Sequence, residues 1–270
     1  MVAVAGVAKL YRMRVGKSAP LVRVLNLHDV AQVDRLADML RFLRAHYHVV
    51  GPEECFRKEL DPKRINVLVT FDDGYASWVN VVLPALSSLH IKALFFVSSG
   101  LLDVHGDEAA RDRYVKERLL ISTRETLSWN GLRALQCAGH TIGGHTTSHA
   151  RLSLMQQHEL RAEVANDKRQ IETMLGTQLK AFAYPFGEHT TRIESIVRDA
   201  GYTYAFCNKA RFARFDSLLR IPRLFVEDDT SIAELKHGIE GGCDVYERMK
   251  TLVRVTSAKT TFEAPFDATT

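Results

Sequence analysis

The sequence has little of what marks several classes of protein. Its 270 residues include only four cysteines, none in a Cys-x-x-Cys pair, which argues against a disulfide scaffold or a cysteine-rich zinc cage. No apolar run approaches the roughly 18 residues that a membrane-spanning helix requires. With 16 Gly and 7 Pro, the chain is not collagen-like or a Pro/Gly-rich disordered segment. The cysteines are expected to be free thiols in a reducing compartment: Cys55, Cys137, Cys207 and Cys243.

No block of like charge occurs either. Lys and Arg number 36 against 32 Asp and Glu, a net charge of +4 that is spread along the chain. Nucleic-acid binding is therefore not expected, whereas mild attraction to an anionic group is. The short apolar stretch Val2–Ala8 precedes its basic residues, the reverse of a secretory signal. We expect a cytoplasmic protein without a transmembrane segment, which could meet a membrane surface through its substrate; the sequence does not indicate an oligomeric state.

What the sequence does contain is an alternation of short β-branched or aromatic runs with segments of helical period. This pattern indicates parallel βα units. Eight such runs favour a single α/β barrel, a distorted (β/α)7–8 barrel that suits this length, over an open doubly wound sheet. The expected strands are Leu21–Leu27, Tyr47–Val50, Ile65–Phe71, Ile91–Val97, His140–Gly143, Leu179–Tyr184, Tyr202–Cys207 and Leu219–Val226.

Capping residues place the ends of two helices. The longest helix is expected over Leu154–Leu175, with Ser153 at its N-cap and Gly176 just past its end. A capping box of Ser231 and Glu234 begins the last helix.

The charged segment Asp103–Arg118 interrupts the alternation and is expected to be a solvated helix or loop. Residues from 241 to the end lack a clear period. We divide the chain into an N-terminal extension (1–20), a catalytic domain (21–240) and a C-terminal tail (241–270).

Two adjacent carboxylates, Asp72 and Asp73, follow the apolar run that ends at Phe71, and Gly74 comes next. Asp-Gly is also a common turn dipeptide. Two neighbouring carboxylates repel each other unless a cation or a proton separates their roles. This segment therefore favours a site in which one carboxylate binds a metal ion and the other acts as a base.

Two further segments follow expected strands. His145 and His149 are four residues apart, a spacing that can chelate one ion but also occurs in surface or capping histidines. The run Phe182-Ala183-Tyr184-Pro185-Phe186-Gly187 more often serves packing than a site. Because strand ends converge on one face of an α/β barrel, we expect these segments to meet there, together with His28. One Asp and two His would give Zn²⁺ three ligands and an open position.

The order TFDDG, GGHTTSH and FAYPFG resembles the polysaccharide deacetylases with a NodB homology domain, carbohydrate esterase family 4. The resemblance runs from about Leu21 to Gly241. Its N-terminal part, Leu25–Val30, is similar to the branch that deacetylates poly-N-acetylglucosamine-like glycans. The resemblance implies a distorted (β/α) barrel and the hydrolysis of an N-acetyl group on an amino sugar.

Carried over to matching positions, the resemblance implies that Asp72 is the general base. It also implies that Asp73, His145 and His149 bind one divalent metal ion. Zinc is expected, with cobalt and nickel as alternatives.

The sequence departs from the family in the third motif. Ala183 stands where the family has an arginine that orients the base, and Phe186 stands where it has a tyrosine. We expect Phe186 to act through its backbone N–H on the oxyanion, and we count Tyr184 with it as a substrate-binding residue. Our hypothesis is that Arg223 supplies the missing guanidinium.

The general acid has two candidates. Leu235-Lys236-His237 matches the family's late Leu-x-His motif in letters, but it lies inside an expected capped helix. His28 lies at the end of an expected strand, so we prefer it as the acid or transition-state stabiliser.

These expectations describe a metal-dependent hydrolase that removes an N-acetyl group from an amino-sugar-containing glycan or glycoconjugate and releases acetate. Its substrate would be an oligosaccharide or a lipid-linked or nucleotide-linked sugar, because polymeric glycans are remodelled outside the cytoplasm. An N-deformylase of a lipid-linked amino sugar and a non-catalytic glycan-binding descendant remain open. A glycosidase would need carboxylates on different strand ends, and a two-metal phosphoesterase would need more Asp, Asn and His there.

Overall fold

The computed structural model describes residues 20–122, 124–213, 215 and 217–244. The expected N-terminal extension, apart from residue 20, and the expected tail from residue 245 onwards lie outside the described residues.

Seven parallel strands of the described chain close into a barrel, which confirms the expected fold and excludes the open doubly wound sheet. Closure occurs because β1 pairs with β3 along its whole length on one side and with β8 on the other. A further short strand, β2 (His48–Val49), pairs with β3 alone. In order around the ring, the strands are β1 (Leu21–Leu27), β3 (Ile65–Phe71), β4 (Leu94–Val97), β5 (Thr141–Gly144), β6 (Ala181–Ala183), β7 (Tyr204–Asn208) and β8 (Ile221–Phe225).

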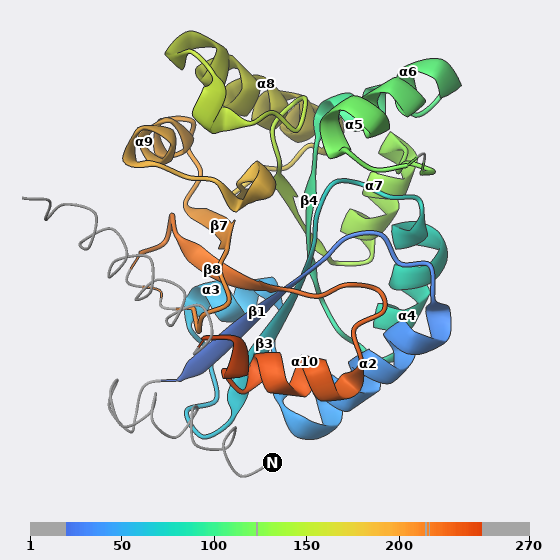
Figure 1. Ribbon diagram of the computed structural model, residues 1–270, viewed down its shortest axis with the longest axis vertical. Helices are drawn as coiled ribbons and strands as arrows, with labels where there is room; N and C mark the ends of the chain where they lie inside the picture. The colour runs from blue at the N-terminus through green and yellow to red at the C-terminus, as the bar shows by residue number, and fades with distance from the viewer. Residues whose placement is uncertain (1–19, 123, 214, 216, 245–270) are drawn as a thin grey trace, which may run out of the picture.

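Helices surround the strands (Figure 1). Their apolar faces cover the barrel; in the first helix Leu36, Leu40 and Leu43 are buried at the expected helical spacing. A π-helical turn, Trp78–Val82, leads into α4 (Leu83–Ser88). Another, Val115–Leu119, follows α6 (Glu108–Tyr114). The helices are α2 (Val33–His46), α3 (Pro52–Arg57), α4 (Leu83–Ser88), α5 (Ser99–Asp103), α6 (Glu108–Tyr114), α7 (Trp129–Cys137), α8 (Gln157–Leu175), α9 (Thr191–Asp199) and α10 (Ile232–Ile239).

The long helix α8 begins at Gln157, three residues later than expected. Ser153 does not cap it, because its hydroxyl donates to the Glu188 carboxylate. Gln156 takes the N-cap position instead. The other end is as expected: Gly176 has φ 65°, the left-handed conformation that ends many helices.

The charged segment Asp103–Arg118 is mostly exposed, as expected of a solvated helix or loop. Helix α6 within it has no buried residue. The π-helical turn that follows α6 buries Val115 and, just beyond the segment, Leu119.

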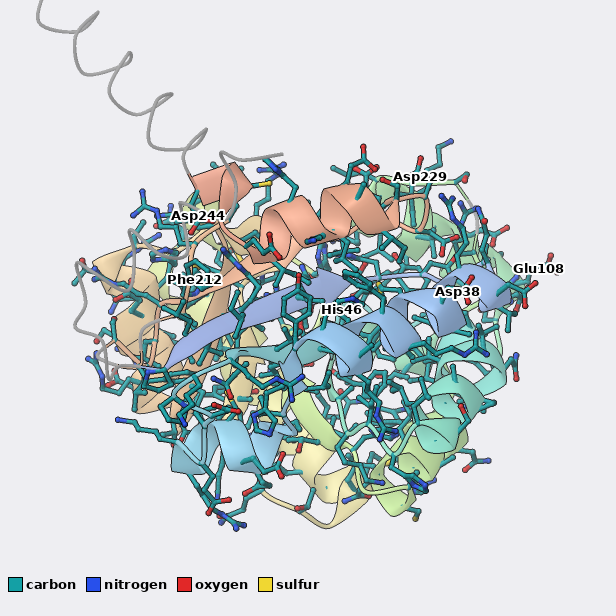
Figure 2. All side chains as sticks on the ribbon, turned by 90° about the horizontal axis from the view of Figure 1, so that it is seen from below. Asp38, His46, Glu108, Phe212, Asp229 and Asp244 are labelled. Carbon is teal, nitrogen blue, oxygen red and sulfur yellow. The ribbon has the colours of Figure 1, made fainter. Side chains whose placement is uncertain are left out.

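The other end of the barrel is closed by Arg23 of β1. Its buried guanidinium pairs with Asp244 at 3.0 Å and lies over the ring of Phe212, 4.0 Å from its centroid. Phe212 and Asp244 lie together at one end of the molecule, with Asp38, Glu108 and Asp229 toward the other (Figure 2).

Three smaller expectations can be checked in the described residues. Ser231 and Glu234 form the expected capping box of α10. The four cysteines are free thiols. No described helix is long and apolar enough to cross a membrane.

Candidate active site

The loops after β3 and β5 bring Asp73, His145 and His149 together. The Nε2 atoms of both histidines lie 3.5 Å from Oδ1 of Asp73, and all three side chains are buried. The three potential ligand atoms lie within 4.8 Å of one another. Oδ1 of Asp73 is buried without a hydrogen-bond partner among the described residues. A buried carboxylate oxygen that faces two imidazole nitrogens and has no donor fits a divalent cation.

Hydrogen bonds from the surrounding chain fix the orientation of each of these three side chains. Nδ1 of His145 lies 2.8 Å from the Ala183 carbonyl oxygen, and Nδ1 of His149 lies 3.1 Å from that of Arg118. The Tyr75 hydroxyl donates to Oδ2 of Asp73 at 2.7 Å. Such outer contacts turn both Nε2 atoms and one carboxylate oxygen toward a common point.

Electrostatics at this point favour a positive charge. Burial raises the pKa of Asp73, but His145 and His149 more than offset this and hold it well below its usual range. Burial lowers the pKa of His145, but the carboxylates of Asp73 and Asp72 bring it above its ordinary value. For His149 burial prevails and lowers the pKa to about 4. His149 is therefore neutral at neutral pH, as a metal ligand must be.

Beside this cluster, Asp72 forms a bidentate ion pair with Arg223 of β8. The two guanidinium nitrogens donate to the two carboxylate oxygens at 2.6 Å each, and both side chains are buried. Burial raises the pKa of Asp72, but the charge and hydrogen bonding of Arg223, together with the charges of His145 and His28, lower it below its usual value. Arg223 also donates to Oγ1 of Thr70 and Oδ1 of Asn208. A guanidinium therefore stands next to the candidate base, although the residue at the family's arginine position is Ala183.

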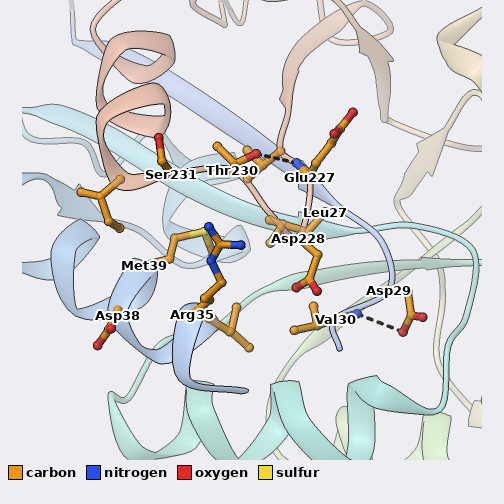
Figure 3. Close-up of a pocket in the computed structure, with 13 residues that line it drawn as sticks. Leu27, Asp29, Val30, Arg35, Asp38, Met39, Glu227, Asp228, Thr230 and Ser231 are labelled. Carbon is orange, nitrogen blue, oxygen red and sulfur yellow. Dashed lines mark hydrogen bonds between the residues drawn. The ribbon is translucent and has the colours of Figure 1, made fainter. Parts of the chain in front are cut away.

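A cavity of about 760 Å³ opens over these residues. Six of the residues singled out from the sequence line it: His28, Asp72, Asp73, His145, His149 and Phe186. Arg223 lies behind Asp72 and does not line the cavity. A smaller cavity of about 230 Å³ adjoins it between α2 and α10 (Figure 3). The two cavities share Asp29 and the segment Val226–Asp228.

Of the two candidates for the general acid, the structure brings only His28 to the cavity. Its Nδ1 is buried without a hydrogen-bond partner among the described side chains, and its ring lies 5.1 Å from that of Phe225. His237 is exposed on α10 and does not line the cavity.

The two aromatic residues after β6 lie in different places. Phe186 lines the cavity, its ring 4.7 Å from that of His149. Tyr184 is buried and donates its hydroxyl to the Leu219 carbonyl oxygen at 3.0 Å. It packs against the ring of Phe182 and does not line the cavity, so it is not placed for the direct substrate contact expected from the sequence.

These positions can be compared with known proteins. The polysaccharide deacetylase family model matches residues 59–205, more than half of the chain. The chain belongs to the polysaccharide deacetylase family. Membership of this family supports N-deacetylation of a glycan as the activity.

Curated relatives of this chain are distant. The poly-beta-1,6-N-acetyl-D-glucosamine N-deacetylase of Escherichia coli (strain K12) is 21% identical over 197 residues, 64% of this chain and 29% of its own length. The putative polysaccharide deacetylase YxkH of Bacillus subtilis (strain 168) is 21% identical over 190 residues, 66% of this chain and 61% of its own. The chain thus spans less than two thirds of either relative.

Solved structures share the fold. The Streptococcus pyogenes deacetylase PplD in complex with acetate has a TM-score of 0.68 at 21% identity, covering 82% of this chain and 99% of its own. IcaB from Ammonifex degensii has a TM-score of 0.67 at 22% identity, covering 83% and 98%. At this level of identity the likeness establishes the fold alone.

Backbone strain gathers at this candidate site. Seven residues other than glycine have positive φ in the described chain, and four of them belong to it: Asp73 (85°), Thr146 (68°), His149 (49°) and Phe186 (59°). Such conformations persist only where the surrounding structure enforces them, and they cluster at functional sites.

Several residues that line the cavity were not singled out from the sequence, and two of them lie at strand ends. Asn208 and Phe225 end β7 and β8. The same strand-end rule that singled out His28 would have found both. The bond from Tyr75 to Asp73 had no comparable signal, because a tyrosine after a turn is more often a packing residue.

Proposed function

We propose that this polysaccharide deacetylase is a metal-dependent hydrolase that removes the N-acetyl group from an amino-sugar unit. One observation carries the proposal: the buried Oδ1 of Asp73 has no hydrogen-bond donor among the described residues and faces two imidazole nitrogens, next to the Asp72–Arg223 pair. A carboxylate held as an ion beside a cation site is the arrangement that hydrolysis of an unreactive amide requires.

Asp73, His145 and His149 would hold the ion, and two imidazoles with one carboxylate suit Zn²⁺, with Co²⁺ or Ni²⁺ as alternatives. When bound, a divalent ion at this point supplies Lewis-acid polarisation of the acetamide carbonyl and lowers the pKa of water from about 15.7 toward about 7.

Asp72 takes the proton of the attacking water in this proposal. The Arg223 fork fixes the plane of its carboxylate and keeps it ionised at neutral pH. A weakly basic carboxylate suffices because the water to be deprotonated is itself acidified.

His28 protonates the departing amine. It lies on the β1 side of the cavity, with an Nδ1 that no described protein group uses. The backbone N–H of Phe186 would donate to the developing oxyanion; one such donor typically contributes about 3 kcal/mol to transition-state stabilisation. The products are acetate and a free amino sugar.

The cavity supports an amino sugar as the class of substrate. Its volume of about 760 Å³ exceeds the space that an acetamide group needs, and the half-exposed ring of Phe225 offers a face on which a sugar can stack. We therefore propose an N-acetylated amino sugar within an oligosaccharide or on a lipid or nucleotide carrier. The names of relatives that act on poly-beta-1,6-N-acetyl-D-glucosamine and on chitin support the amino-sugar class.

The test is acetate release from N-acetylglucosamine oligomers by the purified protein after loading with zinc, with free amine counted in parallel. We expect equal amounts of acetate and amine. Asp72→Asn should retain the metal and lose turnover. Failure of the zinc-loaded protein to act on acetylated or formylated amino sugars would refute the proposal, and formate release alone would reassign it as a deformylase.

A further inference from the structure

Helix α8 lies outside the barrel and packs against both β5 and α5 (Figure 1). Two of its carboxylates, Glu163 and Asp167, are four residues apart and therefore lie on one face of the helix. Both face the segment His145–His149, which carries two of the three proposed metal ligands.

Asp167 is fully buried and uses both of its oxygens as acceptors. Oδ1 accepts the backbone N–H of Ser99, the first residue of α5, at 2.9 Å. Oδ2 accepts the backbone N–H of His145 at 3.0 Å. Burial raises the pKa of Asp167 to about 7, although these hydrogen bonds oppose the rise. Burying a carboxyl group here costs free energy, and its two hydrogen bonds offset part of that cost.

Glu163 holds the other end of the same segment. Its Oε2 accepts the backbone N–H of Ser148 at 2.9 Å, and its Oε1 accepts the Ser148 hydroxyl at 2.8 Å. Its backbone carbonyl accepts the N–H of Thr147 at 3.3 Å. The backbone of the residue directly before His149 is thus tied to α8.

The fit between α8 and β5 leaves no spare room. A Cβ at Gly144 would lie 2.8 Å from Oδ2 of Asp167 and 2.1 Å from the Tyr202 hydroxyl oxygen. The segment beyond Gly144 contains two strained residues, Thr146 and His149, with φ of 68° and 49°. Backbone of this kind relaxes unless outside contacts hold it.

We propose that Asp167 and Glu163 are positioning residues, which hold the backbone on which His145 and His149 are mounted so that both imidazoles meet Asp73. This inference rests on the proposed function of that cluster as a metal site. A carboxylate suits the position of Asp167 because it offers acceptors to two N–H groups, whereas an asparagine offers one acceptor and sets an N–H₂ group against the other donor.

The test compares Asp167→Asn and Glu163→Ala with the wild type and with Ile171→Val. Ile171 is buried on the same helix, one turn beyond Asp167, and makes no polar contact, so its variant controls for general loosening of α8. Zinc affinity is measured by competition with a chromophoric chelator, the absorption spectrum of the Co²⁺-substituted proteins reports ligand geometry, and thermal unfolding of the apo-proteins reports stability.

We expect Asp167→Asn and Glu163→Ala to bind zinc about 10- to 100-fold more weakly, the usual effect of losing an outer contact of a metal ligand. Their Co²⁺ spectra should be altered. Ile171→Val should lower the melting temperature and leave the zinc affinity and the Co²⁺ spectrum unchanged.

Wild-type zinc affinity in both carboxylate variants would overturn the inference, as would an equal loss of affinity in Ile171→Val. If Asp167→Asn does not fold, Glu163→Ala decides by the same criteria, because Glu163 is only partly buried. A wild-type protein that binds no zinc would refute the proposed function itself. Normal wild-type binding with unchanged variants would refute only the positioning roles.

Discussion

Replacing Arg223 by lysine tests the Asp72–Arg223 pair most directly. In the wild type two parallel hydrogen bonds of 2.6 Å join the buried guanidinium and carboxylate. Lysine keeps the positive charge, but its single ammonium group cannot reproduce the planar fork. We therefore expect Asp72 to lose at least one charged hydrogen bond and the fixed plane of its carboxylate.

The magnitude follows from these contacts. A hydrogen bond to a charged group contributes about 1.5–3 kcal/mol. Because about 1.4 kcal/mol corresponds to tenfold in rate, kcat/KM should fall about 10- to 100-fold. Burial raises the pKa of Asp72, and the Arg223 pair is the main contribution that lowers it, so weakening that pair raises the pKa. Since the base works in its ionised form, the acidic limb of the pH profile of kcat/KM should move to higher pH.

The same shift has a consequence for stability. A carboxyl group with a lowered native pKa stabilises the fold above its unfolded pKa of about 3.9, and this contribution is lost as the pH falls through the native value. The difference in the free energy of unfolding between wild type and Arg223→Lys should therefore be full at neutral pH and shrink in acid.

The assay is acetate release from N-acetylglucosamine oligomers across pH, with metal content and urea unfolding measured on each protein. Arg23→Lys is the matched control, because Arg23 is also buried and paired with an aspartate, but at the opposite end of the barrel. It should lose stability and keep the wild-type acidic limb. A folded, fully metallated Arg223→Lys with wild-type kcat/KM and an unmoved limb would refute the reasoning.

Three further predictions concern single substitutions. Asp73→Asn should lower zinc affinity at least 100-fold in equilibrium dialysis, and a full metal complement would remove Asp73 as a ligand. His28→Gln should lower kcat by about 10²- to 10⁴-fold, the usual contribution of a general acid, while His237→Gln leaves it unchanged; the reverse result would exchange their roles. Gly144→Ala would place a Cβ 2.1 Å from the Tyr202 hydroxyl oxygen and should destabilise the fold by about 1–3 kcal/mol in urea unfolding, whereas an unchanged midpoint would mean that this contact can open.

The barrel could be predicted from the sequence because each βα unit carries its own local pattern, and all eight expected runs form strands. The number of strands that form the ring could not be predicted. β1 pairs directly with β3 through seven residues, so β2 contacts β3 only at Asn66 and Val67. Ring closure depends on partners far apart in the chain, and local periodicity does not record such partners.

The same division applies to the candidate site. Asp72, Asp73, His145 and His149 could be singled out because strand ends converge in a parallel barrel. Asp167 could not, because it lies in a helical stretch of charged and polar residues, Asn166–Arg169, that is typical of a solvated face. Its role depends on backbone N–H groups from two other elements, which no sequence pattern marks.

The pairing of β1 with β8 makes the deacetylase site dependent on the last strand of the ring. During synthesis β1 is made before the other strands of the ring. The edge of β1 that pairs with β8 therefore stays unpaired until residues 221–225 have been made. Arg223 arrives on that same strand, so a chain that stops short of β8 exposes two strand edges and leaves the Asp72 carboxylate without its counter-charge. Fragments released before β8 is made would therefore be prone to edge-to-edge association and would lack the guanidinium that orients the Asp72 carboxylate.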